Sequence, residues 1–236
     1  MNNAPFRHTL TSQNPLISSI FTIIFTKTND KEKHYKMAEN KEKKRMTPKI
    51  NNANKLTDSR FLNMYELDVQ HRNGAEAKYY VASRAKTTED LAATSGEVKP
   101  AAVFMMATYK QKIVLIRQYR YPVGGYIYEL PAGLIDEGES PVEAAKREMK
   151  EETGLDFVPL NTAWAQKPWL SSPGMTDEAC TMICGKCYGE PTNSNQESSE
   201  DIQVVLVDAQ QAIRILNEET VDVRAAFALI SHFNLF

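Results

Sequence analysis

Short hydrophobic runs, either alternating with polar residues or continuous, recur between residues 62 and 207 of the chain. They are rich in β-branched and aromatic residues, which favour strands, and turn-forming sequences such as HRNG and TSGE interrupt them. The pattern predicts strands at LNMYELDVQ (62–70), AKYYVASR (77–84), VKPAAVFMMAT (98–108), KIVLIRQYR (112–120), YIYELPAG (126–133), ACTMICGKCYG (179–189) and DIQVVLV (201–207). The polar residues 190–200, between the last two runs, predict a loop.

Three other stretches have apolar residues at helical spacing. Two lie at the end of the chain, AQQAIRILNEE (209–219) and VDVRAAFALISHF (221–233). The third begins at Ser140, where the sequence SPVE forms a capping box with proline at the first helical position, and it ends before Gly154. Its apolar positions Val142, Ala145 and Met149 predict a buried stripe. Strands and helices together predict an α+β domain.

The first 57 residues differ in composition from the rest. They contain an apolar run, Leu16–Thr26, followed by a polar, lysine-rich segment. The run is too short to span a bilayer, which takes about 20 residues. It has the character of a signal peptide's apolar region, but no small-residue cleavage site follows it. A third interpretation is that translation starts at Met37 or Met46. We interpret residues 1–57 as a disordered or artefactual extension and expect no membrane role.

Removal of the residues before Met37 is expected to leave folding and activity unchanged. These residues carry no motif, and a polar, lysine-rich sequence buries too little apolar surface to fold by itself. Solubility, thermal unfolding and activity of the truncated and full chains measure this. An insoluble or inactive truncated protein would show that the extension belongs to the domain.

The length and the net charge of the chain limit the classes of function that it can have. The chain has 236 residues, enough for one or two domains. Lys and Arg total 28 against 30 Asp and Glu, which gives a net charge of -2 and no electrostatic footprint for nucleic acid or an anionic membrane. Cys180, Cys184 and Cys187 lie in one predicted strand, and no second CxxC pair or nearby histidine completes a zinc site. We interpret them as buried free thiols.

One face of the predicted helix 140–153 is acidic. Glu148 and Glu152 are four residues apart and Glu151 is three from Glu148, so their side chains are neighbours. Like charges at this spacing destabilise a helix by roughly 0.2–0.5 kcal/mol per pair, which Arg147, four residues before Glu151, partly offsets. A solvated acidic surface is one interpretation. The other is a site for a hard cation, magnesium or manganese, because the cluster offers oxygen ligands alone.

The residues around this helix favour the second interpretation. Gly133 to Leu155, GLIDEGESPVEAAKREMKEETGL, resembles the Nudix box, G-x5-E-x7-R-E-U-x-E-E-x-G-U with U apolar, at every fixed position. A chance match has a frequency of about 10⁻⁸ per window at ordinary residue usage. The resemblance implies the Nudix fold, a mixed β-sheet between helices in an α/β/α sandwich, with an N-terminal antiparallel β-sheet subdomain. It also implies hydrolysis of a nucleoside diphosphate linked to a further group.

The same resemblance implies roles for individual residues. Mg²⁺, with Mn²⁺ as the alternative, is bound by Glu148, Glu151, Glu152 and the carbonyl of Ala132. Arg147 orients the carboxylates, and Glu151 also assists catalysis. The catalytic base is a glutamate just before the last predicted strand, with Glu200 as first choice and Glu197 as second.

The sequence on either side of the Nudix box indicates which subfamily of Nudix hydrolases the chain resembles. The stretch QYRYPVGGYIYELPAG resembles the matching strand of ADP-ribose pyrophosphatases, whose arginine and glutamate meet the substrate. Arg120 and Glu129 are the aligned residues here, and a cross-strand ion pair is the alternative interpretation. The segment YYVASR resembles the part of the adenine pocket that supplies a stacking aromatic residue and an arginine. The candidates are Tyr79, with Tyr80 as alternative, and Arg84. Further substrate-binding positions implied are Leu134 and, in the Ser171–Met175 loop, Ser172.

The expected function is therefore magnesium-dependent hydrolysis of ADP-ribose to AMP and ribose 5-phosphate. Another Nudix pyrophosphatase activity, on GDP-mannose, UDP-glucose or NADH, is the first alternative, and a non-catalytic ADP-ribose-sensing module is the second. The expected domains are the extension 1–57, a β subdomain 58–97 for dimerisation and adenine binding, and a Nudix hydrolase domain 98–236. The family implies a homodimer. We expect a cytoplasmic location, and the balanced charge predicts that the protein binds neither nucleic acid nor membrane.

Overall fold

The structure is a computed structural model that describes residues 46–165, 167–192 and 201–236. Apart from Lys49 and Gln70, both of its sheets fall within one compact unit, which comprises Ile50–Val69 and Glu76–Phe236. The predicted apolar run Leu16–Thr26 and the two candidates for the catalytic base, Glu197 and Glu200, lie outside the described residues.

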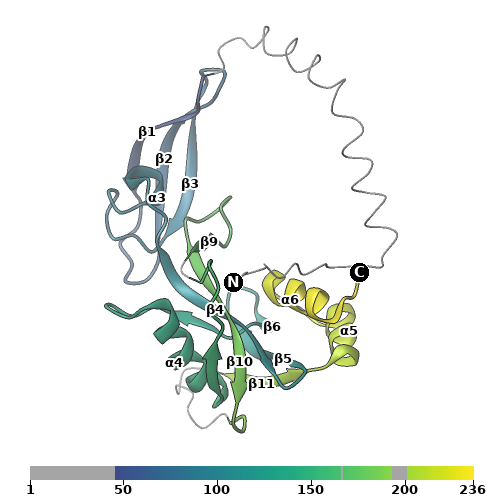
Figure 1. Cartoon of the computed structure of the whole chain (residues 1–236). Helices are drawn as coiled ribbons and strands as arrows, with labels where there is room; N and C mark the ends of the chain where they lie inside the picture. Colours follow the sequence, from purple (N-terminus) through teal and green to yellow (C-terminus); the bar gives the residue numbers. More distant parts are fainter. Residues whose placement is uncertain (1–45, 166, 193–200) are drawn as a thin grey trace, which may run out of the picture. The chain divides into compact units, whose positions relative to one another are not determined.

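The larger sheet is mixed and, within the described ranges, has eight strands. Its main path runs in the order β11-β5-β4-β10-β8, while β6 pairs with β5, β7 with β4 and β9 with β10. Strands β4 and β10 lie side by side and run parallel, whereas β5 runs antiparallel to both β4 and β11 (Figure 1). The strands are β4 Pro100–Tyr109, β5 Lys112–Arg120, β6 Gly125–Glu129, β7 Ala132–Leu134, β8 Asp156–Pro159, β9 Pro168–Leu170, β10 Ala179–Tyr188 and β11 Ile202–Val207.

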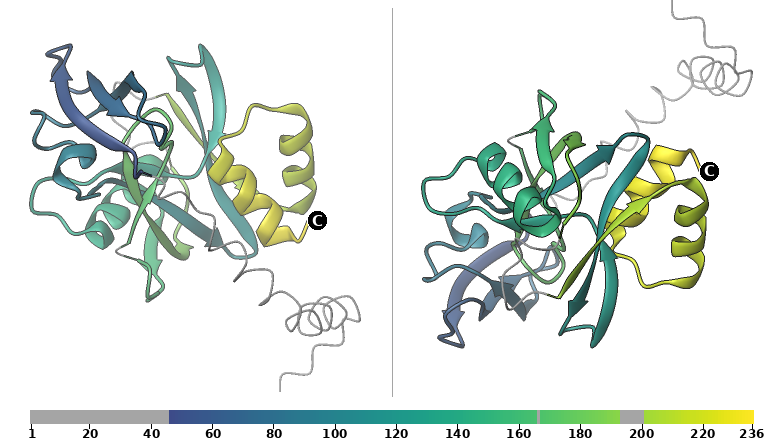
Figure 2. Two further views of the ribbon diagram at one scale, coloured as in Figure 1. Left: turned by 90° about the horizontal axis from the view of Figure 1, so that it is seen from above. Right: turned by 90° about the horizontal axis from the view of Figure 1, so that it is seen from below.

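Alternation along the strands directs side chains to two separate cores. On one face, Val103 and Met105 pack with Ala145 of helix α4 (Pro141–Thr153). On the other face, Phe104 packs with residues of α5 (Ala209–Glu218) and α6 (Val223–Phe233). Figure 2 shows the two yellow C-terminal helices on one side of the sheet and α4 on the other. The predicted sheet between helices is confirmed.

A second, three-stranded antiparallel sheet precedes the first. It has the order β1-β2-β3, with β1 Lys49–Lys55, β2 Asn63–Gln70 and β3 Glu76–Ser83. Tyr65, Leu67 and Leu91 form its small core. Strand β1 lies inside the range 1–57 that the sequence assigned to an extension, so that boundary was wrong. The β1 sequence KINNANK lacks the alternation of apolar and polar residues from which a strand can be predicted. The strand forms because it pairs with the edge of β2.

The predicted strand YIYELPAG is in fact two strands. Strand β6 ends at Glu129 and pairs with β5, whereas β7 begins at Ala132 and pairs with β4. Between them lies Pro131, which lacks an N–H for a sheet ladder but whose carbonyl accepts a hydrogen bond from Met105 N at 2.8 Å. The chain thereby crosses from the edge of β5 to that of β4 just before Gly133. The short strands β8 and β9 and the four-residue helix α3 (Ala92–Ser95) were not predicted.

The predicted free thiols are confirmed. Cys180 and Cys187 on β10 are buried and Cys184 is half-buried, all three without a disulfide. Burial raises the pKa of the Cys187 thiol to about 12. No helix in the described part of the chain combines the length and the apolar character that crossing a membrane requires.

Candidate active site

Helix α4 carries the central part of the site, and its two ends are fixed as the sequence predicts. The Ser140 hydroxyl accepts a hydrogen bond from Glu143 N at 3.3 Å, and the Glu143 carboxylate accepts one from Ser140 N at 2.9 Å. At the other end Gly154 has φ 72°, a left-handed conformation in which its N–H donates to Lys150 O. Ala145 and Met149 are fully buried, while Val142 is partly buried. Arg147, Glu148 and Glu151 lie on the less buried side of α4, whereas Glu152 is buried beside Met149.

Gly133 allows the carboxylate of Glu148 to lie directly against strand β7. A Cβ atom added at Gly133 would be 1.8 Å from Glu148 Cδ and 2.0 and 2.3 Å from its two carboxylate oxygens. No other residue type leaves that space. Because Gly133 pairs with Val103 of β4, the backbone on which Glu148 rests is part of the central sheet.

Glu152, one turn further along α4, is held against the same strand. Its side chain is only 3% exposed, and its Oε2 accepts a hydrogen bond from Ala132 N at 3.1 Å. The structure thus brings Glu148 and Glu152 to neighbouring residues of β7, Gly133 and Ala132. Glu151 lies at the edge of this group with its side chain 43% exposed.

Arg147 links the acidic residues of the site to one another. Its Nη1 donates to Glu148 Oε1 at 2.8 Å and to Glu151 Oε2 at 3.1 Å, and its Nη2 donates to the carbonyl of Leu134 at 2.9 Å. Nε and Nη2 also bind the two oxygens of Glu139. The Glu139 hydrogen bond is the main reason that the pKa of Arg147 is raised, and Arg147 in turn lowers the pKa of Glu139. This arrangement suits the orienting role expected of Arg147.

The donor atoms fit a hard divalent cation. All are oxygens: the Glu148 carboxylate occupies the space left by the missing side chain of Gly133, and the Glu152 carboxylate lies against the backbone of Ala132. Within the described residues, no three His, Cys, Asp or Glu side chains already converge as they would around a bound metal ion, and Arg147 contacts Glu148 and Glu151 instead.

Arg120 and Glu129 form the cross-strand ion pair that the sequence allowed as an alternative. Arg120 Nε donates to Glu129 Oε2 at 2.6 Å. The two side chains differ in accessibility, because that of Arg120 is 40% exposed and that of Glu129 only 8%. The pair joins β5 to the end of β6, three residues before Ala132.

The residues expected in an adenine pocket lie in separate cavities. Tyr79 lines an apolar cavity of about 350 Å³, with Pro173 and Met175, and its hydroxyl donates to Gly174 O at 2.7 Å. Arg84 instead lines a neighbouring, acidic cavity of about 340 Å³ and pairs with Glu178 at 3.2 Å.

Two further residues expected to bind substrate lie elsewhere. Tyr80 donates to Glu66 and is absent from both cavities. The carbonyl of Ser172 accepts hydrogen bonds from Met175 N and Thr176 N, which folds the Ser171–Met175 loop into a turn. Within one chain, the structure does not bring Tyr79 and Arg84 together.

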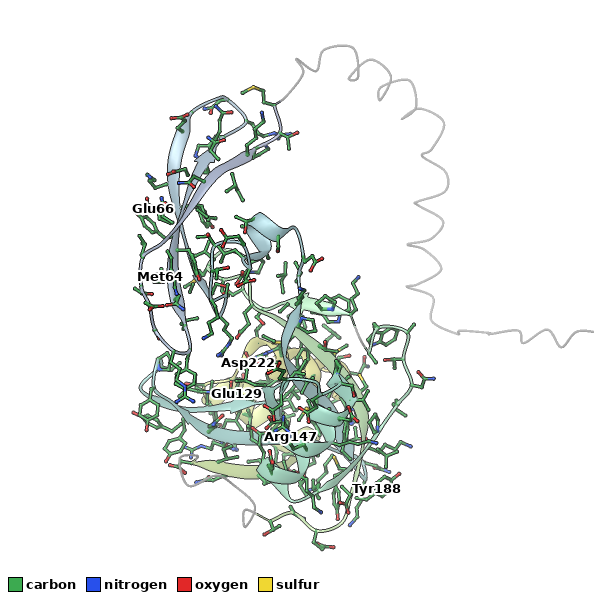
Figure 3. The ribbon with its side chains drawn as sticks, turned by 90° about the vertical axis from the view of Figure 1, so that its left-hand side faces the viewer. Met64, Glu66, Glu129, Arg147, Tyr188 and Asp222 are labelled. Carbon is green, nitrogen blue, oxygen red and sulfur yellow. The ribbon has the colours of Figure 1, made fainter. Side chains whose placement is uncertain are left out.

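Arg224 at the start of α6 was missed. Its guanidinium donates to Asp222 Oδ2 at 3.0 Å and lies 5.4 Å from the centre of the Phe104 ring, and Phe104 is the strand partner of Ala132. Asp222 N donates to Tyr128 O, so this helix end lies beside Glu129, as Figure 3 shows. The available signal was one charged residue in the otherwise apolar run VRAAFAL.

Comparison with known proteins identifies the family. Residues 98–228 match the profile of the NUDIX domain. The nudix hydrolase 2 of Caenorhabditis elegans is 42% identical over 104 residues, which are 42% of this chain and 46% of that protein. The ADP-ribose pyrophosphatase of Bacillus subtilis is 26% identical over 177 residues, 74% of this chain and 86% of that one. The ADP-sugar pyrophosphatase of Mus musculus is 39% identical over 89 residues, 37% of this chain and 41% of that one. The chain thus spans less than half of the C. elegans and mouse relatives.

A solved structure supports the fold. The crystal structure of an ADP compounds hydrolase superposes with a TM-score of 0.55 at 22% identity, covering 78% of this chain and 91% of that one. The domain match covers more than half of the chain and includes α4 with its carboxylates. This protein is therefore a member of the Nudix family.

Proposed function

We propose that this protein hydrolyses the diphosphate bond of ADP-ribose to give AMP and ribose 5-phosphate, with magnesium as cofactor. The observation that carries the proposal is the placing of the Glu148 and Glu152 carboxylates against the Ala132–Gly133 backbone. The names of the B. subtilis and mouse relatives, an ADP-ribose and an ADP-sugar pyrophosphatase, support this substrate class.

In this proposal the acidic residues of α4 bind the cation and Arg147 holds two of them in position. Glu148, Glu151, Glu152 and the Ala132 carbonyl would hold the cation, which when bound neutralises charge on the diphosphate and makes a bound water more acidic. Arg147 keeps the Glu148 and Glu151 carboxylates in fixed positions through its two hydrogen bonds from Nη1. Glu200, which lies outside the described residues, is proposed to take a proton from the attacking water.

Substrate recognition is assigned to groups around this helix. Arg120 offers a planar fork of donors suited to a phosphate. Tyr79 offers a flat face to the purine, and such stacking contributes about 1–3 kcal/mol per base. The loop containing Ser172 would take the terminal ribose. Because Tyr79 and Arg84 line separate cavities in one chain, we propose that a second copy of the chain completes the adenine pocket in a homodimer.

ADP-ribose is expected to be cleaved with a higher kcat/KM than GDP-mannose, UDP-glucose, NADH or ATP. Stacking alone does not separate adenine from guanine, so discrimination requires hydrogen bonds to the base edge, and a site built on such bonds rejects mismatched partners strongly. A panel at matched concentrations, with products separated by chromatography, measures this. Faster cleavage of GDP-mannose or UDP-glucose would overturn the substrate but keep the Nudix chemistry. Binding of ADP-ribose without cleavage by folded protein would favour the sensing module.

A further inference from the structure

The two side chains of the Arg120–Glu129 ion pair differ in how accessible they are to a ligand. Glu129 is 6% exposed as a residue, so almost none of its surface is open to an incoming molecule. Arg120, 40% exposed at its side chain, remains accessible on the same face of the sheet. A guanidinium has five N–H donors in a planar fork, and the bond to Glu129 Oε2 uses the one on Nε. The remaining donors include the two terminal nitrogens, which suit a bidentate contact with a phosphate.

The pair is also costly to separate. If Arg120 left, the nearly buried Glu129 carboxylate would lose its hydrogen-bonded cation and keep only the longer-range attraction of Arg224, which disfavours such a substrate complex. Antiparallel pairing of β5 with β6 fixes the backbones from which both side chains project, because Ile116 lies opposite Glu129 and Arg120 opposite Gly125. The strand pairing and the ion pair therefore hold the guanidinium in one place before substrate arrives.

We propose that Glu129 is a positioning residue that holds Arg120 toward the diphosphate, and that Glu129 does not itself contact the nucleoside. This differs from the role that the family resemblance implied for Glu129, and it rests on the proposed function. It makes Glu129 important for affinity toward the diphosphate and irrelevant to the choice of base.

The test is a double-mutant cycle of Arg120→Met and Glu129→Met, with Glu129→Gln as the conservative variant. The kcat and KM of each are measured with ADP-ribose and with GDP-ribose. Glu129→Met is expected to lower kcat/KM by about tenfold to a hundredfold, the effect of one charge-assisted hydrogen bond. The loss should be the same factor for both substrates. Glu129→Gln should recover part of it, because its side-chain carbonyl still accepts a bond from Arg120 Nε. In the Arg120→Met background, Glu129→Met should cause little further loss.

A matched control is the pair at the end of α5, where Arg214 Nη1 donates to Glu219 at the same 2.6 Å and neither residue is assigned a part in binding or catalysis. Glu219→Gln should leave all kinetic constants unchanged. A change in the ADP-ribose to GDP-ribose ratio in Glu129→Gln, or additive losses in the cycle, would overturn the positioning role. The substrate of the unmodified protein tests the proposed function. The double-mutant cycle can be measured with any diphosphate that the protein cleaves, so its result tests the role of Glu129 separately. If it cleaves none, calorimetric affinities for ADP-ribose complete the same cycle.

Discussion

Replacement of Glu152 by glutamine is expected to lower turnover by at least about two orders of magnitude in the presence of magnesium, while the fold is retained. Glutamine has the same shape, and its side-chain oxygen can still accept the hydrogen bond from Ala132 N that holds Glu152 in place. The negative charge is lost, and one acceptor oxygen is replaced by an amide NH2. The variant therefore separates the structural role of this buried side chain from its role as an anionic ligand.

The measurement is kcat for ADP-ribose over a range of magnesium concentrations, with thermal unfolding as the check on folding. Glu218→Gln removes a carboxylate from the exposed end of α5, and it should behave as the unmodified protein. A Glu152→Gln variant that turns over at the parental rate in limiting magnesium would show that this face of α4 is not the metal site.

A single methyl group at Gly133 is expected to have an effect of similar size. The added Cβ would overlap the Glu148 carboxylate at 1.8 Å, so this carboxylate must move away from β7. Displacement of a reacting or ligand group by about 1 Å can reduce turnover about a hundredfold. Folding should survive, because Gly133 does not have positive φ and the overlapping atoms are the end of a flexible side chain.

Gly125→Ala is the matched control for Gly133→Ala. Gly125 also lies in a strand of the larger sheet, and an added Cβ there would meet no atom within 4 Å. Both variants are compared by kcat with ADP-ribose and by melting temperature. If Gly133→Ala keeps full activity, the position of Glu148 against β7 is not needed for turnover. If it loses activity together with its melting transition, the effect is on folding.

Features set by local sequence were predicted correctly. The capping box at Ser140 and the stop at Gly154 delimit α4 in the structure because each depends on residues within one turn of the helix. The convergence of Glu148 and Glu152 follows from their spacing of four residues. That they lie against the backbone of β7 could not be read from the spacing, which does not say which strand a helix covers; the family resemblance implied only that the Ala132 carbonyl shares their metal site.

Features set by contacts distant in sequence were missed. Strand β1 is mostly polar and depends on its pairing with β2. The break at Pro131 depends on β7 having a different partner from β6. Arg224 comes close to the site only because Asp222 N donates to the Tyr128 carbonyl, a contact across ninety-odd residues that no local pattern reports.

The most direct test of the account is the identification of products from ADP-ribose with purified protein, in the presence of magnesium and again with a chelator. We expect AMP and ribose 5-phosphate in equal amounts with magnesium, and neither with the chelator or with Glu152→Gln. Intact ADP-ribose after incubation of folded protein with magnesium, or equal product formation by Glu152→Gln, would contradict the assignment of the α4 carboxylates as the catalytic centre.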